Sequence, residues 1–147
     1  MSNAYSFQDF VATLVGPTGS CNLGYGAAVA EEGIDFTQNN EVNTMTIGSD
    51  GKGMHSLHAD KSGRVTVRLL KTSPTNQVLM AMYDAQRISA SLWGQNVIVG
   101  RQIVAGDTVT ALSCAFKKPP DLKYAQEGGL VEWEWDTIEI DRILGTY

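Results

Sequence analysis

The sequence predicts a mainly β protein, with two packed antiparallel sheets in a sandwich or partly open barrel and one flanking α-helix near residues 74–87. Two observations lead to this prediction. Fifteen glycines separate short runs in which apolar and polar residues alternate, which is the pattern of antiparallel strands joined by tight turns. Only the stretch around residues 74–87 has helical periodicity instead.

The strand that leads into this helix has the clearest alternation. Val65, Val67 and Leu69 share one face, and the residues between them, including Arg64 and Arg68, point the other way. Because successive side chains of a strand face opposite sides, the three apolar residues are expected in the core.

The helix itself is predicted from its first turn and its apolar stripe. The Ser73 hydroxyl can cap the helix, and Pro74 suits its first turn, where a missing N–H costs nothing. Helical spacing then places four residues on the buried face, namely Val78, Leu79, Met82 and Gln86.

The other strands are expected between glycine-rich or polar turns. They are residues 6–15, 33–38, 42–47, 54–58, 96–104, 108–116 and 130–140. Residues 16–32 read as a loop that contains at most a short strand. Residues 48–60 are expected to include a flexible loop, because Gly48, Gly51 and Gly53 lie close together. We therefore expect residues 1–147 to form a single domain with a flexible loop around residues 48–60.

Composition limits the classes of function. The chain has 147 residues, a net charge of −5 and a pI near 4.9. Its eleven basic residues are scattered, and Lys117-Lys118 is the densest pair. A site that grips nucleic acid needs clustered basic residues, so the sequence argues against one. Charged residues make up only 18%, which leaves neutral surface available for contacts between subunits.

The cysteines and the apolar runs indicate where the protein is found. Cys21 and Cys114 are far apart in the sequence, and without a signal peptide they are expected to be free thiols in a reducing cytoplasm. The first residues lack the basic and apolar regions of a secretion signal. No apolar run approaches ~20 residues, so we expect no membrane association.

The last strand contains an irregularity. Glu132, Glu134 and Asp136 share one face, opposite two tryptophans, and from Ile138 the phase reverses, so that Ile140 lies on the side of the acids. A strict period of two cannot bury both halves on the same face. Either a β-bulge interrupts the strand near residues 136–137, or the strand passes into a second environment, such as a subunit interface.

Several groups of residues contain side chains that can carry out chemistry or bind a metal ion. His55, His58 and Asp60 could hold a metal ion, but the surroundings favour a solvated hairpin. A cysteine–histidine nucleophile pair has nothing in the sequence to bring its members together. The acids of residues 132–136 have a spacing that glycosidases also use, but the tryptophans point away from them. The loop at 48–53 has too few carboxylates for calcium, and residues 16–24 lack a phosphate-binding lysine. We therefore expect no enzyme, no metal site and no cofactor.

Several segments together resemble the phage tail tube proteins, over about residues 5–145. They are Asn43-Thr-Met-Thr-Ile-Gly-Ser-Asp50, Met54-His-Ser-Leu-His-Ala59, residues 61–74, Ala115-Phe-Lys-Lys118 and Tyr124-Ala-Gln-Glu-Gly-Gly-Leu-Val-Glu-Trp133. The resemblance implies a structural virion protein that assembles into hexameric rings, which stack into the tail tube that conducts DNA. It implies assembly in the host bacterial cytoplasm. The implied partners are other copies of the chain, a baseplate hub, a tape-measure protein and, in a contractile tail, a sheath protein.

The resemblance also suggests roles for particular residues. The residues expected to contact the next ring are Gly48, Ser49, Asp50, Gly51, Lys52, Gly53 and Met54. An acidic lumen would keep DNA from adhering to the wall, and the residues expected to contribute to it are Glu132, Glu134, Asp136, Asp35 and Glu41.

A different class of function stays open at this point. A β-sandwich can also be a binding module for carbohydrate or peptide, which would present an exposed aromatic platform. Only Trp93, Trp133 and Trp135 could form that platform.

Overall fold

The protein was analysed as a computed structural model that describes residues 3–26 and 29–147. Within these ranges the fold consists of nine strands, one short 3-10 helix and one α-helix. The strands are β1 (Phe10–Gly16), β2 (Gly19–Asn22), β3 (Val29–Gln38), β4 (Asn43–Ile47), β5 (Gly53–Leu57), β6 (Gly63–Leu70), β7 (Asn96–Gln102), β8 (Thr108–Phe116) and β9 (Leu130–Ile143). The helices are η1 (Phe7–Asp9) and α1 (Thr75–Gln86). The prediction of a mainly β fold with one flanking helix is confirmed.

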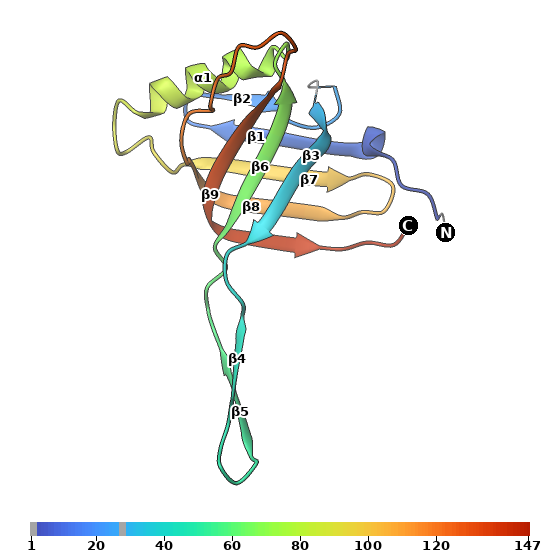
Figure 1. The fold of residues 1–147 in the computed structure, drawn as a ribbon, viewed down its shortest axis with the longest axis vertical. Helices are drawn as coiled ribbons and strands as arrows, with labels where there is room; N and C mark the ends of the chain where they lie inside the picture. The colour runs from blue at the N-terminus through green and yellow to red at the C-terminus, as the bar shows by residue number, and fades with distance from the viewer. Residues whose placement is uncertain (1–2, 27–28) are drawn as a thin grey trace.

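Seven strands form one antiparallel sheet in the order β2-β1-β7-β8-β9-β6-β3. This sheet folds over on itself, so that β3, β6 and the first part of β9 cross in front of β1, β7 and β8 (Figure 1). Strand β9 makes the fold-over possible because it is shared: Leu130–Thr137 pair with β6, and Trp135–Ile143 pair with β8. The result is a partly open barrel whose two layers belong to one continuous ladder.

The core lies between the two layers. Its side chains come from both, and include Ala12, Leu14, Val65, Val67, Leu69, Ile98, Ala111, Trp133 and Trp135. Phe116 is central to an aromatic cluster, with ring centroids 5.4 Å from Trp135, 5.7 Å from Tyr83 and 6.0 Å from Trp133. Such tilted and edge-to-face contacts add to the apolar burial that holds the layers together. The predicted inward face of Val65, Val67 and Leu69 is confirmed.

Helix α1 packs beside β2 at one end of the barrel (Figure 1). The Ser73 hydroxyl accepts a hydrogen bond of 3.3 Å from the Thr75 backbone N–H, which is the capping role predicted for it. The buried face of the helix comprises Leu79, Met82, Tyr83 and Gln86. The prediction was wrong for Val78, which is exposed; Tyr83 takes its place because its ring completes the aromatic cluster.

The phase change in β9 is present and falls between Thr137 and Ile140, both of which are buried. Opposite it, Ser113 of β8 adopts a left-handed φ of 54°, and the register between β7 and β8 shifts by one residue. Strand β9 also leaves β6 at Thr137. The irregularity is therefore the point where β8 and β9 bend together from one layer into the other.

Candidate assembly surfaces

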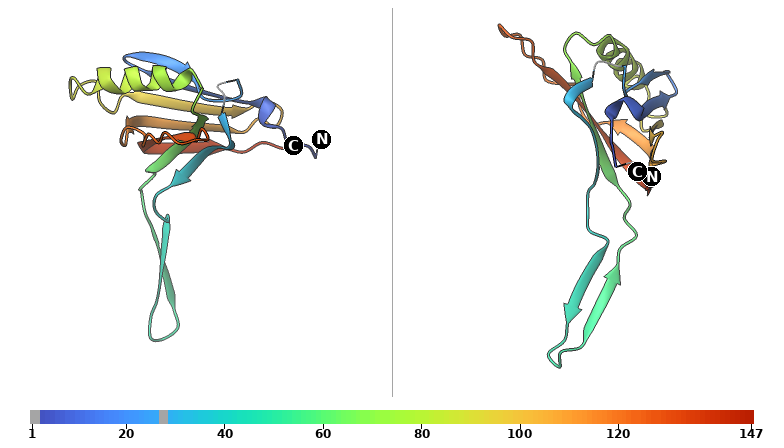
Figure 2. Two further views of the ribbon diagram at one scale, coloured as in Figure 1. Left: turned by 45° about the horizontal axis from the view of Figure 1, so that its top comes forward. Right: turned by 90° about the vertical axis from the view of Figure 1, so that its right-hand side faces the viewer.

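Strands β4 and β5 form a two-stranded hairpin that projects from the barrel (Figures 1 and 2). The predicted flexible loop around residues 48–60 thus contains the tip of this hairpin and its second strand. At the tip, the Gly48 N–H donates to the Lys52 carbonyl over 2.7 Å, and Gly51 has a φ of 85°. A glycine is suited to that position because other residues adopt positive φ at a cost. The predicted contact residues, Gly48 to Met54, therefore form the tip and the start of β5.

The base of the hairpin is held by polar contacts. The Asp60 carboxylate accepts hydrogen bonds of 2.6 Å from the Asn40 amide and 2.8 Å from the Ser62 backbone N–H. The Ser62 hydroxyl contributes most to stabilising the charged form of Asp60, followed by the Asn40 amide and the Ser62 backbone N–H. Together these hydrogen bonds lower the pKa of Asp60 to about 2. They tie the outgoing and returning strands of the hairpin together where both leave the barrel.

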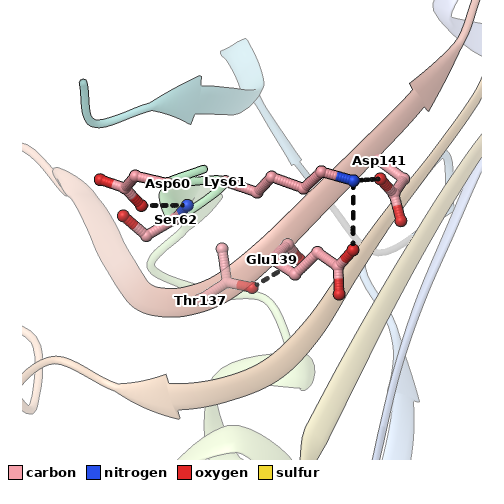
Figure 3. Close-up of polar contacts among 6 residues, drawn as sticks. All are labelled: Asp60, Lys61, Ser62, Thr137, Glu139 and Asp141. Carbon is pink, nitrogen blue, oxygen red and sulfur yellow. Dashed lines mark hydrogen bonds and ion pairs between the residues drawn. The ribbon is translucent and has the colours of Figure 1, made fainter. Parts of the chain in front are cut away.

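The Lys61 ammonium group lies 3.6 Å from the carboxylates of both Glu139 and Asp141 in β9 (Figure 3). The Ile140 backbone N–H also donates to the Lys61 carbonyl over 3.0 Å. These side chains are largely exposed, so each ion pair contributes little to stability. Together with the backbone bond, however, they attach the base of the hairpin to the second half of β9.

Four of the five acids predicted to line a lumen lie on the outer face of β3, β6 and β9. Cross-strand pairing sets Glu132 opposite Arg68 and Asp136 opposite Arg64. We call the seven charged side chains here the charge ladder; its members are Asp35, Arg64, Arg68, Lys117, Glu132, Glu134 and Asp136.

Every acid of the charge ladder has a basic partner. Arg68 bridges Asp35 at 2.8 Å and Glu132 at 3.5 Å. Lys117 lies 3.7 Å from Glu134, and Arg64 lies 3.7 Å from Asp136. With four acids and three bases, the ladder carries a net charge of −1. The face is therefore close to electrically balanced, and not the strongly acidic surface that the sequence suggested.

The fifth acid, Glu41, lies elsewhere. It follows β3 at the base of the hairpin, where it lines a recess together with His58 and Asp60. The structure does not bring it together with the charge ladder.

A groove of about 470 Å³ lies at the end of the barrel away from the hairpin. Its walls are the first turns of α1, the segment between β8 and β9, and β9 itself, and its lining residues include Met80, Pro119, Leu122, Tyr124 and Trp133. The indole N–H of Trp133 donates to the Asn76 side-chain carbonyl over 3.0 Å, which joins β9 to the helix.

The groove could not be predicted from the sequence because its lining residues come from three separate segments. The double proline Pro119-Pro120 was the one signal in the sequence that this segment has a fixed extended path. Lys71 completes the groove, with its ammonium 3.8 Å from the centre of the Tyr124 ring.

The histidines and cysteines that could in principle bind a metal ion or act as nucleophiles do not lie together in one site. His55 and His58 lie on the hairpin, where they contact Asn43 and Thr44, respectively. Cys21 and Cys114 are free thiols in the barrel, and burial raises the pKa of both. Among the described residues, no group of histidine, cysteine and carboxylate side chains could hold a metal ion.

The aromatic platform expected of a binding module is also not formed. Trp133 and Trp135 are fully buried, and Trp93 packs against Tyr83 with ring centroids 6.0 Å apart. No helix within residues 3–26 and 29–147 has the length and apolar character needed to cross a membrane.

Comparison with solved structures finds the same fold in parts of contractile injection systems. The chain is similar to a protein in the cryo-EM structure of the anti-feeding prophage baseplate, with a TM-score of 0.61, 12% identity and 97% of each chain covered. It is similar to one in the tube-terminating cap of that prophage, with a TM-score of 0.57 and 9% identity over 99% of this chain and 95% of the other. A chain of the sheath–tube complex of an extracellular contractile injection system gives a TM-score of 0.59 at 8% identity, covering 99% and 93%.

The sequence comparisons identify a family. No curated protein sequence matches the chain. The family model described as the bacteriophage PhiTE tail tube protein matches residues 1–145, which is nearly the whole chain. The structural neighbours, which come from a cap, a baseplate and a sheath–tube complex, share the fold of the chain. The chain therefore belongs to the PhiTE family of phage tail tube proteins.

Proposed function

We propose that copies of this chain close into hexameric rings and that these rings stack into a tail tube through which phage DNA passes. The observation that carries the proposal is the projecting β4–β5 hairpin. An isolated two-stranded hairpin is only marginally stable in water, yet this one exposes Met45, Ile47, Met54 and Leu57 to solvent. An arm of this kind gains stability when its apolar side chains are covered by another subunit.

Ring closure is supported by the edge of the large sheet. Strand β3 is the last strand of the ladder and pairs with β6 on one side. Its other edge offers backbone N–H and C=O groups to a neighbouring copy. A contact between this edge and a different surface of the next copy is heterologous, so it closes into a ring when the rotation between copies permits.

The charge ladder supplies a suitable wall for the lumen. With a net charge of −1 on its seven charged groups, it has no excess of the basic residues that bind DNA phosphates. DNA can pass such a wall without being retained. In this proposal Asp35, Glu132, Glu134 and Asp136 face the lumen, and Glu41 lies near the contact between rings.

The place of the protein in the virion follows from the same proposal. The tube is assembled in the host bacterial cytoplasm on a baseplate hub, around a tape-measure protein, and within a sheath if the tail contracts. Sheath, cap and baseplate complexes are the assemblies in which the structural neighbours occur.

Negative-stain electron microscopy of the purified chain, with light scattering over a range of concentrations, tests the proposal. We expect rings or tubes whose abundance rises with concentration. A monomer that persists at all concentrations, and also when added to purified baseplates, would contradict assembly. Helical reconstruction of the tubes tests the lumen: a wall made by any face other than that of β3, β6 and β9 would contradict that assignment.

A further inference from the structure

Residues near the two ends of the chain lie side by side on the barrel (Figures 1 and 2). One segment, residues 5–9, precedes β1 and includes η1. The other, residues 144–147, follows β9. Both are hydrogen-bonded to the turn between β7 and β8, residues 103–107. We call residues 5–9 the entry segment and residues 144–147 the strap.

The strap is attached to this turn by hydrogen bonds that converge on one carboxylate. Asp107 accepts from the Gly145 backbone N–H over 2.5 Å and from the Tyr147 hydroxyl over 3.2 Å. The Thr146 backbone N–H donates to the Ala105 carbonyl over 3.1 Å. Two of these three bonds therefore depend on the side chain of Asp107.

Apolar burial contributes little to the attachment of the strap. Leu144 is 78% exposed, and Gly145 and Thr146 are exposed as well. The fit at Gly145 is nevertheless close, because a Cβ added there would overlap the Ala105 carbonyl oxygen. A segment held by a few exposed hydrogen bonds opens at a lower free energy than the sheet to which it is attached. The strap can therefore release without unfolding of the barrel.

The entry segment covers the side of the barrel between β1 and β3. Among the described residues these strands lie near opposite ends of the seven-stranded ladder and do not pair with each other. The Phe7 ring stacks on Phe10 of β1 with centroids 5.8 Å apart, and it lies 3.9 Å from where a Cβ would be at Gly33 of β3. Phe7 thus bridges the two layers where no strand pairing joins them.

The strap and the entry segment are also linked to each other. The Tyr147 ring packs edge-on against the Tyr5 ring, with centroids 6.1 Å apart. Gln102, at the end of β7, donates from its side-chain amide to the Ser6 carbonyl over 3.3 Å. Its backbone N–H donates to the Asp107 carbonyl over 2.9 Å. The turn that binds the strap therefore also holds the entry segment.

We propose that the strap, latched by Asp107, keeps the entry segment over the side of the barrel between β1 and β3, and that the two segments open together. Opening makes Phe7 and the apolar surface beside β3 accessible while the strands stay paired. This device belongs to a single copy of the chain, so it holds or fails independently of the proposed rings.

Hydrogen exchange in the full-length chain tests the coupling, with Gly145→Ala as the perturbing variant. The added methyl group collides with the Ala105 carbonyl and displaces the strap, but it leaves the entry segment unaltered. The matched control is Gly128→Ala, because a Cβ at Gly128 has no atom within 4 Å. The reporter is the Asp9 amide, which donates to the Ser6 carbonyl within the entry segment over 3.2 Å.

We expect the Asp9 amide to exchange about tenfold faster in Gly145→Ala than in Gly128→Ala or the unaltered chain. The amides of β6 should keep their protection in all three proteins, which checks that the barrel is folded. Faster exchange at Thr146 without a change at Asp9 would overturn the inference, because the strap would then open alone. Full protection of Thr146 in Gly145→Ala would overturn it too, because the strap would then not depend on this fit.

A second variant removes the latch without adding any group. Asp107→Ala deletes the carboxylate that accepts from Gly145 and Tyr147, and we expect the same rise in exchange at Asp9. Its matched control is Asp84→Ala, which is the same chemical change at an exposed position of α1. An equal effect of the two alanine substitutions, or no effect of either at Asp9, would contradict the role of Asp107 as the latch.

Discussion

The side-chain amides of Gln86 and Asn96 form a reciprocal pair: each donates to the carbonyl oxygen of the other over 2.8 Å. Both side chains are completely buried. Gln86 ends α1 and Asn96 begins β7, so the pair fixes the end of the helix to the sheet. Thr18 adds a third member, because its hydroxyl accepts from the Gln86 amide at 3.2 Å.

Removing one member of this pair should destabilise the fold. Asn96→Leu leaves the Gln86 amide buried with a single weak partner, and we expect a loss of about 2 kcal/mol in the free energy of unfolding, measured by urea denaturation. Gln86→Met should cost a similar amount. The double variant should lose less than the sum of the two, because no buried amide is left without its partner.

The matched control for the helix substitution is Gln77→Met, which is the same chemical change at an exposed position of α1. It should alter stability by less than about 0.5 kcal/mol. Strict additivity of the two buried substitutions would show that Gln86 and Asn96 contribute independently.

The fold should become more stable when Ser113, which lies in β8 where this strand bends together with β9, is replaced by glycine. Its φ of 54° costs an L-residue roughly 1 kcal/mol, whereas glycine adopts it freely. We expect Ser113→Gly to gain about 0.5 kcal/mol after the added entropy of the unfolded chain is subtracted. Ser20→Gly, at an exposed position of β2, should instead lose stability. Thermal unfolding measures both variants. A shift of their two thermal midpoints in the same direction would contradict the prediction.

Much of the fold could be predicted because local pattern and tertiary burial agree. The inward residues of β6 follow strict alternation, and the Ser73 cap follows from side-chain chemistry alone. Val78 was misassigned since helical spacing leaves more than one stripe open, and the aromatic cluster around Phe116 selected Tyr83 instead. The hairpin was partly predicted: its strands showed alternation, but a glycine-rich composition does not reveal that the tip forms hydrogen bonds of its own.

The candidate surfaces were predicted less completely. Glu132, Glu134 and Asp136 were correctly placed on one face, yet their neutralisation by Arg64, Arg68 and Lys117 depends on strand register. A single sequence does not show which strands are neighbours. Here β6 pairs with β9, although Leu130 at the start of β9 follows Leu70 at the end of β6 by sixty residues. The groove, which needs three distant segments, could not be derived from periodicity at all.

The two thiols should be poorly reactive in the folded protein. Burial raises the pKa of Cys114, and it raises that of Cys21 to about 11. Because thiolate is the reactive form, Cys21 at pH 8 should react with a disulfide reagent about a hundredfold more slowly than a thiol of pKa 9. Both should react rapidly in urea. Rapid labelling of either cysteine without denaturant would contradict the burial on which this prediction depends.

Acid should loosen the base of the hairpin through Asp60. Its pKa of about 2 in the folded protein lies below the usual value near ~3.9 of an unfolded chain. Between these two values the unfolded state binds more protons, so stability falls as the pH falls through this window. The contribution of Asp60 is therefore fully present above about pH 4 and is lost as the pH drops through about 2.

The pKa of Asp60 can be measured directly by following its carboxyl carbon by NMR from pH 5 to pH 1.5. In Asn40→Ala the carboxylate loses its 2.6 Å amide donor, and the pKa should rise part of the way toward the ordinary value. Hydrogen exchange should then increase first in the backbone amides of Asn39 and Ser62, at the base of the hairpin, and not in β6. A pKa that is unchanged by Asn40→Ala would mean that the Ser62 contacts alone hold the carboxylate, and that the two sides of the hairpin base are not coupled through it.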